Sequence, residues 1–508
     1  MALMSETFDY PGFNAWMAWV GAIDQYLIDT QQAIGYSLFK FFYNIYLHPL
    51  RNYPGPFLAR GTHFANFFWV YKGNLHTKVK QFNAQYGDVV RIAPDMLVYT
   101  SAQAWKDICG HRKAGSGSFL KDGVWYSSVG KTQPSILSAN DADHSRGRRL
   151  LAHAFSEKAL REQEGLLQSY VDLLVNRVRE YAVEGSPADM TRWYNYTTFD
   201  IIGDLAFGEP FGCLETRTYH PWVKVVFQAI KAMTLIRPFI TLFSASVLNM
   251  VVPKKLEKAR DASFEFSKEK VHRRLALQTT RPDFMTYILK HNDEKGMSIE
   301  EIEANANILI VAGSETTASL LSGCTFFLLT HPKVYQKFVD EIRGAFQHEA
   351  DITVQSVSKL PYVLAVLDES LRMYPPTPNV LPRSVPQGGA IIDGKFVPEG
   401  TSVSMAYYAT FRSESNFAKP DCFIPERWLG NDPQFATDKK EALQPFSFGP
   451  RNCLGKNLAY AEMRLIMAKL AWNFDMTLQR DSYDWDQQIT YNVWEKKPLM
   501  VRFTPVKR

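Results

Sequence analysis

Residues 446–455 read Phe-Ser-Phe-Gly-Pro-Arg-Asn-Cys-Leu-Gly, and a helical pattern of apolar residues follows directly at 458–470. Gly449 and Gly455 allow the backbone to fold tightly around Cys453 and to approach a flat partner closely. Amide N–H groups of the turn and of the helix start can face the sulfur, which favours thiolate over thiol. A single thiolate in such a turn suits a haem iron, to which it donates electron density. The alternative for Cys453 is a free cysteine packed in the core.

The composition describes an ordinary globular protein with a substantial core, since 46% of its 508 residues are hydrophobic and 21% are charged. The net charge of +5 includes no basic block, which argues against a nucleic-acid partner. The cysteines are odd in number and form no CxxC pair, so a disulfide framework, an iron–sulfur site and a structural zinc site are disfavoured. They are Cys109, Cys213, Cys324, Cys422 and Cys453.

The chain is expected to be mainly α-helical with small β-sheets. Residues 160–181 have helical spacing, and strand-like runs occur at 88–93, 97–100 and 400–405. One helix stands out because Ser298 and Glu301 form a capping box and Pro332 marks its end, which makes it roughly 45 Å long. Its centre at 308–312 is apolar on all sides and should run through the core, but residues 314–317 turn abruptly polar.

The loop at 446–455 fits the haem-binding signature of the cytochrome P450 family, FxxGxRxCxG, at every fixed position. The chain resembles that family at four further places, in the family's order and across most of its length. They are Ala312-Gly-Ser-Glu-Thr-Thr317, Glu369-Ser-Leu-Arg372, Phe423-Ile-Pro-Glu-Arg-Trp428 and His144-Ser-Arg-Gly-Arg148, where His stands in place of the more usual Trp. The resemblance implies the P450 fold, a helical prism that encloses haem b beneath a long central helix.

The resemblance assigns the catalytic roles to the long helix. Thr316 can return its hydroxyl to the carbonyl of Ala312 and so open a groove that Gly313 keeps free of side chain. Bound O2 would lie there, with Thr316 and Glu315 organising proton delivery.

Other residues are expected to hold the cofactor. Glu369, Arg372 and Arg427 would form a structural triad that supports the cysteine loop. Cationic side chains would bind the two haem propionates. The cofactor-binding residues are Cys453 as metal ligand, His144, Arg148, Arg383, Arg451, Phe446, Gly449, Gly455 and Ala312.

The resemblance implies a monooxygenase that inserts one oxygen atom from O2 into a lipophilic small molecule. The chain has no GxGxxG fingerprint, so electrons would come from an NADPH-dependent flavin reductase, which we expect to dock on Arg146, Arg149 and Lys456. The stretches 46–56 and 144–164 look like fungal microsomal members of terpenoid and polyketide metabolism. Predicted substrate contacts are Phe119, Trp125, Ile308, Ala312, Val380 and Trp494.

The N-terminal part is expected to contact a membrane. Residues 10–23 are uncharged, but Asp24 and Asp29 interrupt the next stretch of chain, so the segment is short for a transmembrane span. An amphipathic helix in the membrane interface and a helix packed on the protein's own body both remain possible. We expect a membrane-associated segment at 1–48, a proline-rich hinge at 49–56 and a catalytic domain at 57–508. Family habit places the enzyme on the endoplasmic reticulum, facing the cytosol.

Two other functions are open on the sequence alone. The first is a haem-thiolate isomerase, dehydratase or oxidative ring-coupler that inserts no oxygen. Some relatives that lack the Glu-Thr pair behave so, and the presence of Glu315 and Thr316 argues against it. The second is a non-catalytic haem carrier or gas sensor, which substrate-induced NADPH consumption would exclude.

Overall fold

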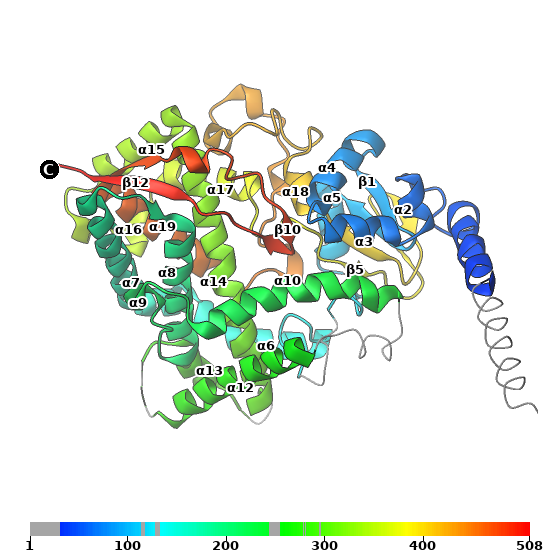
Figure 1. Cartoon of the computed structure of the whole chain (residues 1–508), viewed down its shortest axis with the longest axis horizontal. Coiled ribbons are helices and arrows are strands. Elements are labelled where there is room, and N and C mark those ends of the chain that lie inside the picture. The colour runs from blue at the N-terminus through cyan, green and yellow to red at the C-terminus, as the bar shows by residue number, and fades with distance from the viewer. Residues whose placement is uncertain are drawn as a thin grey trace, which may run out of the picture.

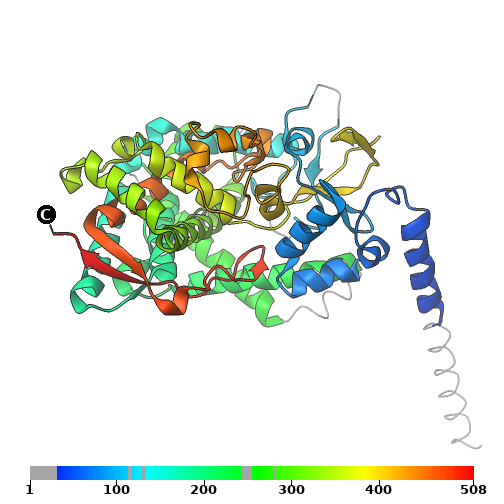
Figure 2. The same cartoon turned by 90° about the horizontal axis from the view of Figure 1, so that it is seen from above.

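The computed structural model describes residues 31–112, 117–126, 133–242, 254–277, 279, 281–293 and 296–507. The segment 10–23 lies outside them. The described chain is mainly helical with small sheets, which confirms the expected fold class. Residues 31–46 form a helix that stands away from the body, at the opposite end of the molecule from the C-terminus (Figures 1 and 2).

The predicted long helix is α14 (Ile299–Thr330), and its Ser298–Glu301 capping box is present. It packs most extensively against α8 (Met190–Phe207) and also contacts α17 (Pro361–Met373) and α19 (Lys456–Asn473). The other long helices are α4 (Leu75–Tyr86), α6 (Asp141–Ala152), α7 (Glu157–Glu184), α10 (Pro221–Leu242), α12 (Lys254–Ala276) and α15 (Pro332–Ala345). Shorter helices are α2 (Phe57–Gly61), α3 (Phe64–Tyr71), α5 (Ala102–Cys109), α9 (Cys213–Thr216), α13 (Phe284–His291), α16 (Val354–Val357) and α18 (Tyr407–Phe411).

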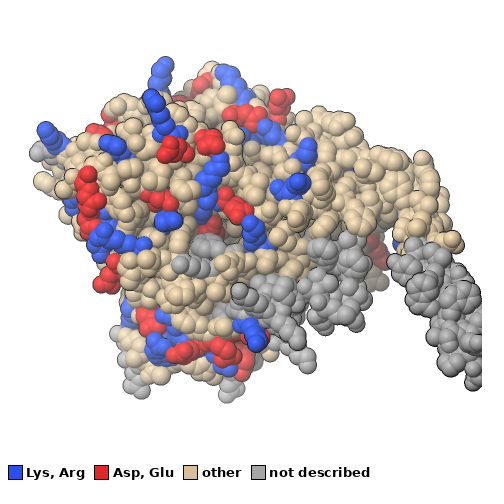
Figure 3. Space-filling view, in the orientation of Figure 1, with Lys and Arg blue, Asp and Glu red and all other residues tan. Residues whose placement is uncertain are grey.

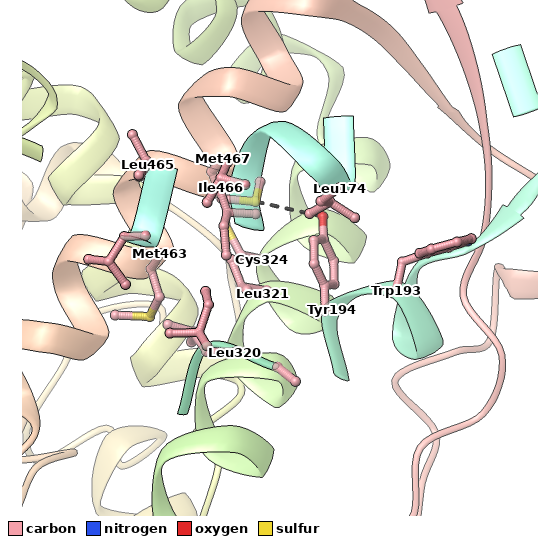
Figure 4. Close-up of a cluster of buried hydrophobic side chains, with 14 of the residues drawn as sticks. Leu174, Trp193, Tyr194, Leu320, Leu321, Cys324, Met463, Leu465, Ile466 and Met467 are labelled. Carbon is pink, nitrogen blue, oxygen red and sulfur yellow. Dashed lines mark hydrogen bonds between the residues drawn. The ribbon is translucent and has the colours of Figure 1, made fainter. Parts of the chain in front are cut away.

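The core of the helical part is built where α8, α14 and α19 meet (Figure 4). Tyr194 lies there completely buried, and its hydroxyl is 2.7 Å from the Thr325 hydroxyl and 3.8 Å from the Met467 sulfur. A buried tyrosine hydroxyl needs such a partner. The contact therefore joins three helices at one polar point within an apolar cluster.

The main sheet has the order β1-β2-β8-β5-β3, and its strands come from both halves of the sequence. The runs predicted at 88–93, 97–100 and 400–405 form β1 (Val89–Ala93), β2 (Met96–Tyr99) and β8 (Ser402–Met405). Strands β2 and β8 are parallel, whereas the other pairs are antiparallel. In the pair of β3 (Leu120–Lys121) with β5 (Arg383–Ser384), Lys121 lies opposite Arg383.

Three smaller sheets complete the described part of the chain. One is three-stranded, in the order β4-β12-β9, and two are two-stranded. The strands are β4 (Ala188–Asp189), β6 (Ala390–Ile392), β7 (Lys395–Val397), β9 (Phe474–Leu478), β10 (Thr490–Tyr491), β11 (Val493–Trp494) and β12 (Met500–Pro505).

The proline-rich segment 49–56 is attached to the body by the buried Arg91. The Arg91 backbone N–H donates to the Pro54 carbonyl at 2.7 Å, and its guanidinium donates to the Leu50 carbonyl at 3.3 Å. A Cβ on Gly55 would lie 2.2 Å from the Arg91 carbonyl oxygen, so only glycine allows this approach. Arg91 also donates to the Asn44 carbonyl at 3.0 Å, so the chain is fixed to the catalytic body from the end of the helix 31–46 onward.

Candidate active site

A cavity of about 320 Å³, called here the central cavity, lies between α14, α6, the cysteine loop at 446–455 and the stretch 376–383. Cys453, Ala312 and Thr316 line it together. Ala312 and Cys453 are accessible because they face this cavity, although α14 runs through the core. The cavity thus unites motifs that lie more than a hundred residues apart.

The cysteine loop turns tightly, and the Cys453 N–H donates to the Phe446 carbonyl at 2.7 Å. Gly449 has a φ of 74°, and a Cβ there would lie 1.9 Å from the Cys109 carbonyl oxygen. Gly449 therefore allows the loop to pack on α5, and it does not line the central cavity as the cofactor-binding prediction required. A Cβ on Gly455 would meet nothing closer than 3.9 Å and would lie 4.0 Å from the Cys453 sulfur. Gly455 therefore keeps space open beside the sulfur.

The surroundings of Cys453 act on its thiol in two opposing directions. Burial raises the pKa of its thiol, and the Gly455 N–H, Arg148 and Lys456 only partly offset this. Within the protein chain alone, burial of the sulfur therefore outweighs the Gly455 amide and the two cations that favour the anion. A metal cation at the sulfur would reverse the balance, since a coordinating thiol loses its proton.

On α14 the expected helix distortion is confirmed, because the Thr316 hydroxyl donates to the Ala312 carbonyl at 2.6 Å. Gly313 lines the central cavity, and a Cβ there would lie 2.7 Å from Ile202 of α8, which lines the same cavity. That Gly313 leaves room for bound O2 stays a prediction.

Glu315 does not line the central cavity. Its carboxylate pairs with the Lys496 ammonium and accepts a hydrogen bond from Ser319 at 3.2 Å. Both charged side chains are at most 5% exposed. Successive residues of an α-helix are about 100° apart, so Glu315 and Thr316 face different neighbours. The structure therefore does not bring the two predicted catalytic side chains together.

Basic side chains crowd one side of the central cavity. The Arg148 guanidinium donates to the Asn452 carbonyl at 2.7 Å, and Arg451 donates to Asp141 at 2.7 Å. The Arg451 Nη1 is buried without a partner among the described residues. The basic residues that line the cavity are Lys121, His144, Arg148, Arg383 and Arg451.

The electrostatics of this group favour an anionic ligand. Burial and the nearby arginines, Arg451 first, lower the pKa of His144 to about 4. Burial, Arg383 and Arg451 likewise lower the pKa of Lys121 to about 7. Two carboxylates placed here would relieve the repulsion and occupy the free Arg451 nitrogen. His144 lies among these cations, where it can donate a hydrogen bond to such a ligand.

The structure brings the predicted triad together at a fully buried place. Arg372 donates to both oxygens of Glu369, at 2.8 and 2.9 Å, and Arg427 Nε lies 3.2 Å from Glu369 Oε1. Arg372 also donates to the carbonyls of Phe411, Pro420 and Cys422. The triad thus ties α17 to residues 411–427, the segment that leads into the cysteine loop.

Of the predicted substrate contacts, Ile308 and Ala312 line the central cavity, but Phe119, Trp125, Val380 and Trp494 do not. Phe119 is buried beneath the Arg112 guanidinium, and Trp494 stacks on Tyr374 at 4.4 Å. Trp125 and Val380 line a separate cavity. The sequence alone does not show whether such an apolar or aromatic side chain packs in the core or lines a ligand cavity.

Two charged residues of the central cavity were missed. Lys121 reaches it only through the β3–β5 pairing, for which a two-residue strand gives no sequence signal. Glu462 lies on α19, where burial raises the pKa of its carboxyl to about 8. The only sign of this residue in the sequence is that an acidic side chain interrupts an apolar helical pattern.

Comparisons with known proteins agree with this geometry. Residues 54–503 match the family model described as Cytochrome P450. The cytochrome P450 monooxygenase astJ of Aspergillus oryzae is 48% identical over 476 residues, which cover 93% of this chain and 95% of that protein. The cytochrome P450 monooxygenase atr2 of Stereocaulon alpinum is 45% identical over 513 residues, which cover both chains completely. The chain belongs to the cytochrome P450 family, whose members are haem-thiolate monooxygenases.

The residues of the central cavity fit a haem. Cys453 offers a sulfur ligand with open space beside it, and the unpaired Arg451 nitrogen lies among cations that suit two propionates. When bound, this group supplies the activation of O2. Thr316 can hold a proton near the cavity, and Arg148 and Arg451 can orient the carboxylates.

Proposed function

We propose that this protein inserts one oxygen atom from O2 into a lipophilic small molecule, a fungal secondary metabolite such as a terpenoid or polyketide, and that its cofactor is haem b. The observation that carries the proposal is one cavity that contains the sulfur of Cys453, the hydroxyl of Thr316 and an apolar wall. Ile202, Ile308 and Leu309 contribute to that wall. Such a lining binds and orients an apolar substrate and limits the access of water.

The assignment to secondary metabolism rests on the relatives and on the resemblance of residues 46–56 and 144–164 to fungal microsomal members. The relatives named above are fungal monooxygenases that align with nearly the whole chain. Their names state a reaction class and no substrate, so the terpenoid or polyketide substrate is part of the proposal.

Electrons would arrive from an NADPH-dependent flavin reductase on the cysteine side of the molecule. Arg149 and Lys456 are exposed and can attract an acidic partner. Arg146, which we also expected to take part, is held by Glu301 and Asp143 at 2.6 and 3.0 Å. Its charge is thus already neutralised, and we withdraw it from the proposed docking surface.

The N-terminal end is proposed to rest on the endoplasmic reticulum membrane. Figure 3 shows few charged side chains over α2 and α3. Large apolar residues stay exposed on residues 31–47, α2 and α3, which is unusual for a surface in contact with water alone. Within the described residues, the single helix long and apolar enough to cross a bilayer is α14, and it lies in the core. The exposed residues are Ile34, Tyr36, Leu38, Phe39, Phe42, Tyr46, Leu47, Phe57, Leu58, Phe64, Phe68 and Tyr71.

Co-expression with a fungal NADPH-dependent reductase, under isotopically labelled O2, tests the function. The expected product is a metabolite that has gained one labelled oxygen atom, and it should be absent from the Cys453→Ser variant. The reduced protein with carbon monoxide should show a strongly red-shifted Soret band, which Cys453→Ser should lose. A product without labelled oxygen would instead support the isomerase, dehydratase or ring-coupling alternative.

A further inference from the structure

A second cavity, of about 170 Å³, lies between α3, α4, residues 122–125 and the ends of β2 and β8. Most of its lining is apolar, and Phe67, Val70, Met96 and Trp125 contribute to it. Helices α3 and α4, which contribute to its lining, lie at the end of the molecule from which the helix 31–46 extends (Figure 1). The proposed monooxygenase reaction does not use this cavity.

The second cavity is separated from the central cavity by a single layer of extended chain. Val380 lines the second cavity and Leu381 lines the central one. The same alternation occurs at Asp122 and Lys121. Successive side chains of an extended segment point to opposite faces, so the two cavities share one wall.

Three polar atoms in the lining of the second cavity are buried and have no hydrogen-bond partner within the described chain: Asn66 Oδ1, Asn379 Oδ1 and Ser402 Oγ. The orientation of the Asn379 amide is set by its N–H₂, which donates to the Thr490 hydroxyl at 3.0 Å. A buried polar atom without a partner is costly, and three around one cavity indicate a missing ligand with donor groups.

The charges around the second cavity favour a neutral ligand. Its two carboxylates already have hydrogen-bonding neighbours, because Asp95 Oδ1 lies 3.3 Å from the His63 imidazole and Asp122 Oδ1 accepts the N–H groups of Val124 and Trp125 at 3.0 and 2.9 Å. No lysine or arginine of the described chain lines the cavity. An anion would therefore meet only repulsion, whereas a neutral ligand with donor groups can pair with the free oxygens without displacing the contacts of Asp95 and Asp122.

We propose that the second cavity is a ligand site for the hydroxyl-bearing end of an otherwise apolar small molecule. The amide oxygens of Asn66 and Asn379 accept hydrogen bonds from its hydroxyl groups, and the Ser402 hydroxyl supplies a third contact. This inference deepens the proposed function and rests on it: the substrate is a lipophile that already carries neutral oxygen groups. An earlier reaction of the hydroxylating or ketone-reducing class must therefore have supplied it.

Equilibrium dialysis of the full-length holoenzyme with para-butylphenol and butylbenzene tests this site. N-phenylimidazole is added first, so that the neighbourhood of the iron is filled. The phenol should bind about tenfold more tightly than the hydrocarbon, the value of one hydrogen bond to an otherwise unpaired buried atom. Asn66→Leu and Ser402→Ala should each reduce this preference, and the double variant, which keeps only Asn379, should reduce it further.

Asn83→Leu is the matched control, because its Oδ1 is also buried and unpaired within the described chain but does not line the second cavity. It should keep the full preference for the phenol. Equal binding of the two probes by the parent protein would overturn the inference, as would an unchanged preference in the double variant. Loss of the preference when N-phenylimidazole is added would place the phenol in the central cavity and would also overturn it.

Failure of the proposed function would be seen separately. The Soret band of the reduced protein with carbon monoxide reports on Cys453 alone, whereas the effect of Asn66→Leu and Ser402→Ala on dialysis reports on the second cavity. Ser402→Ala keeps the backbone pairing of β8, so it remains informative even if Asn66→Leu lowers the yield of folded protein.

Discussion

Replacement of Arg372 by alanine should destroy the support of the cysteine loop. The guanidinium is fully buried and donates both to the Glu369 carboxylate and to three backbone carbonyls. Loss of one partner of a buried ion pair costs about 3–5 kcal/mol. A folded domain has only about 5–15 kcal/mol of stability in total. In the variant, Glu369 still has Arg427 at 3.2 Å as a partner. We therefore expect the loss of the ion pair to lower the free energy of unfolding by the lower half of about 3–5 kcal/mol. The carbonyls that Arg372 no longer binds add a further loss.

The assay compares urea unfolding and haem content of Arg372→Ala with those of Lys337→Ala. Lys337 also pairs with a glutamate, Glu426 at 2.7 Å, but its side chain is 59% exposed. Such a surface pair contributes at most about 1 kcal/mol. Arg372→Ala should be largely haem-free or unfolded, whereas Lys337→Ala should resemble the parent. A soluble, fully haem-loaded Arg372→Ala with the unfolding midpoint of the control would refute the structural role of the triad.

Three further outcomes are expected. Thr316→Ala should divert electrons to peroxide and lower product per NADPH by about tenfold or more, and unchanged coupling would contradict its role in proton delivery. Glu462→Gln should be more stable than the parent at pH 9 and equal to it near pH 5. Burial raises the pKa of the Glu462 carboxyl to about 8, and the stability that its protonated form gives the parent is lost as pH rises. Denaturant titrations across this pH range would show the difference in stability. Lys496→Met should cost about 3–5 kcal/mol of unfolding free energy by leaving Glu315 unpaired. The exposed Lys497→Met should cost at most about 1 kcal/mol, and similar unfolding midpoints would contradict this reasoning.

The sequence predicted those parts of the site that local pattern determines. The capping box at Ser298 fixed the start of α14, and the Thr316 hydroxyl binds the carbonyl four residues earlier, as helical geometry requires. The triad of Glu369, Arg372 and Arg427 was also foreseen, because the family motifs identify residues that meet.

The parts that sequence could not give depend on contacts between distant segments. Glu315 belongs to the same motif as Thr316, but Lys496, some 180 residues later, takes its carboxylate. Trp125 and Val380 were predicted to contact the substrate. Both instead line the second cavity, which a single layer of extended chain separates from the central cavity. Which face an extended segment turns inward is decided by its pairing partner, and β3 is too short to reveal that partner in advance.

The two-residue strand β3 couples the two cavities. Lys121 of this strand lines the central cavity, and the chain that leaves the strand at Asp122 forms part of the wall of the second cavity. Because so short a strand is held in its sheet by its pairing with β5, a shift of that pairing would alter the lining of both cavities at once.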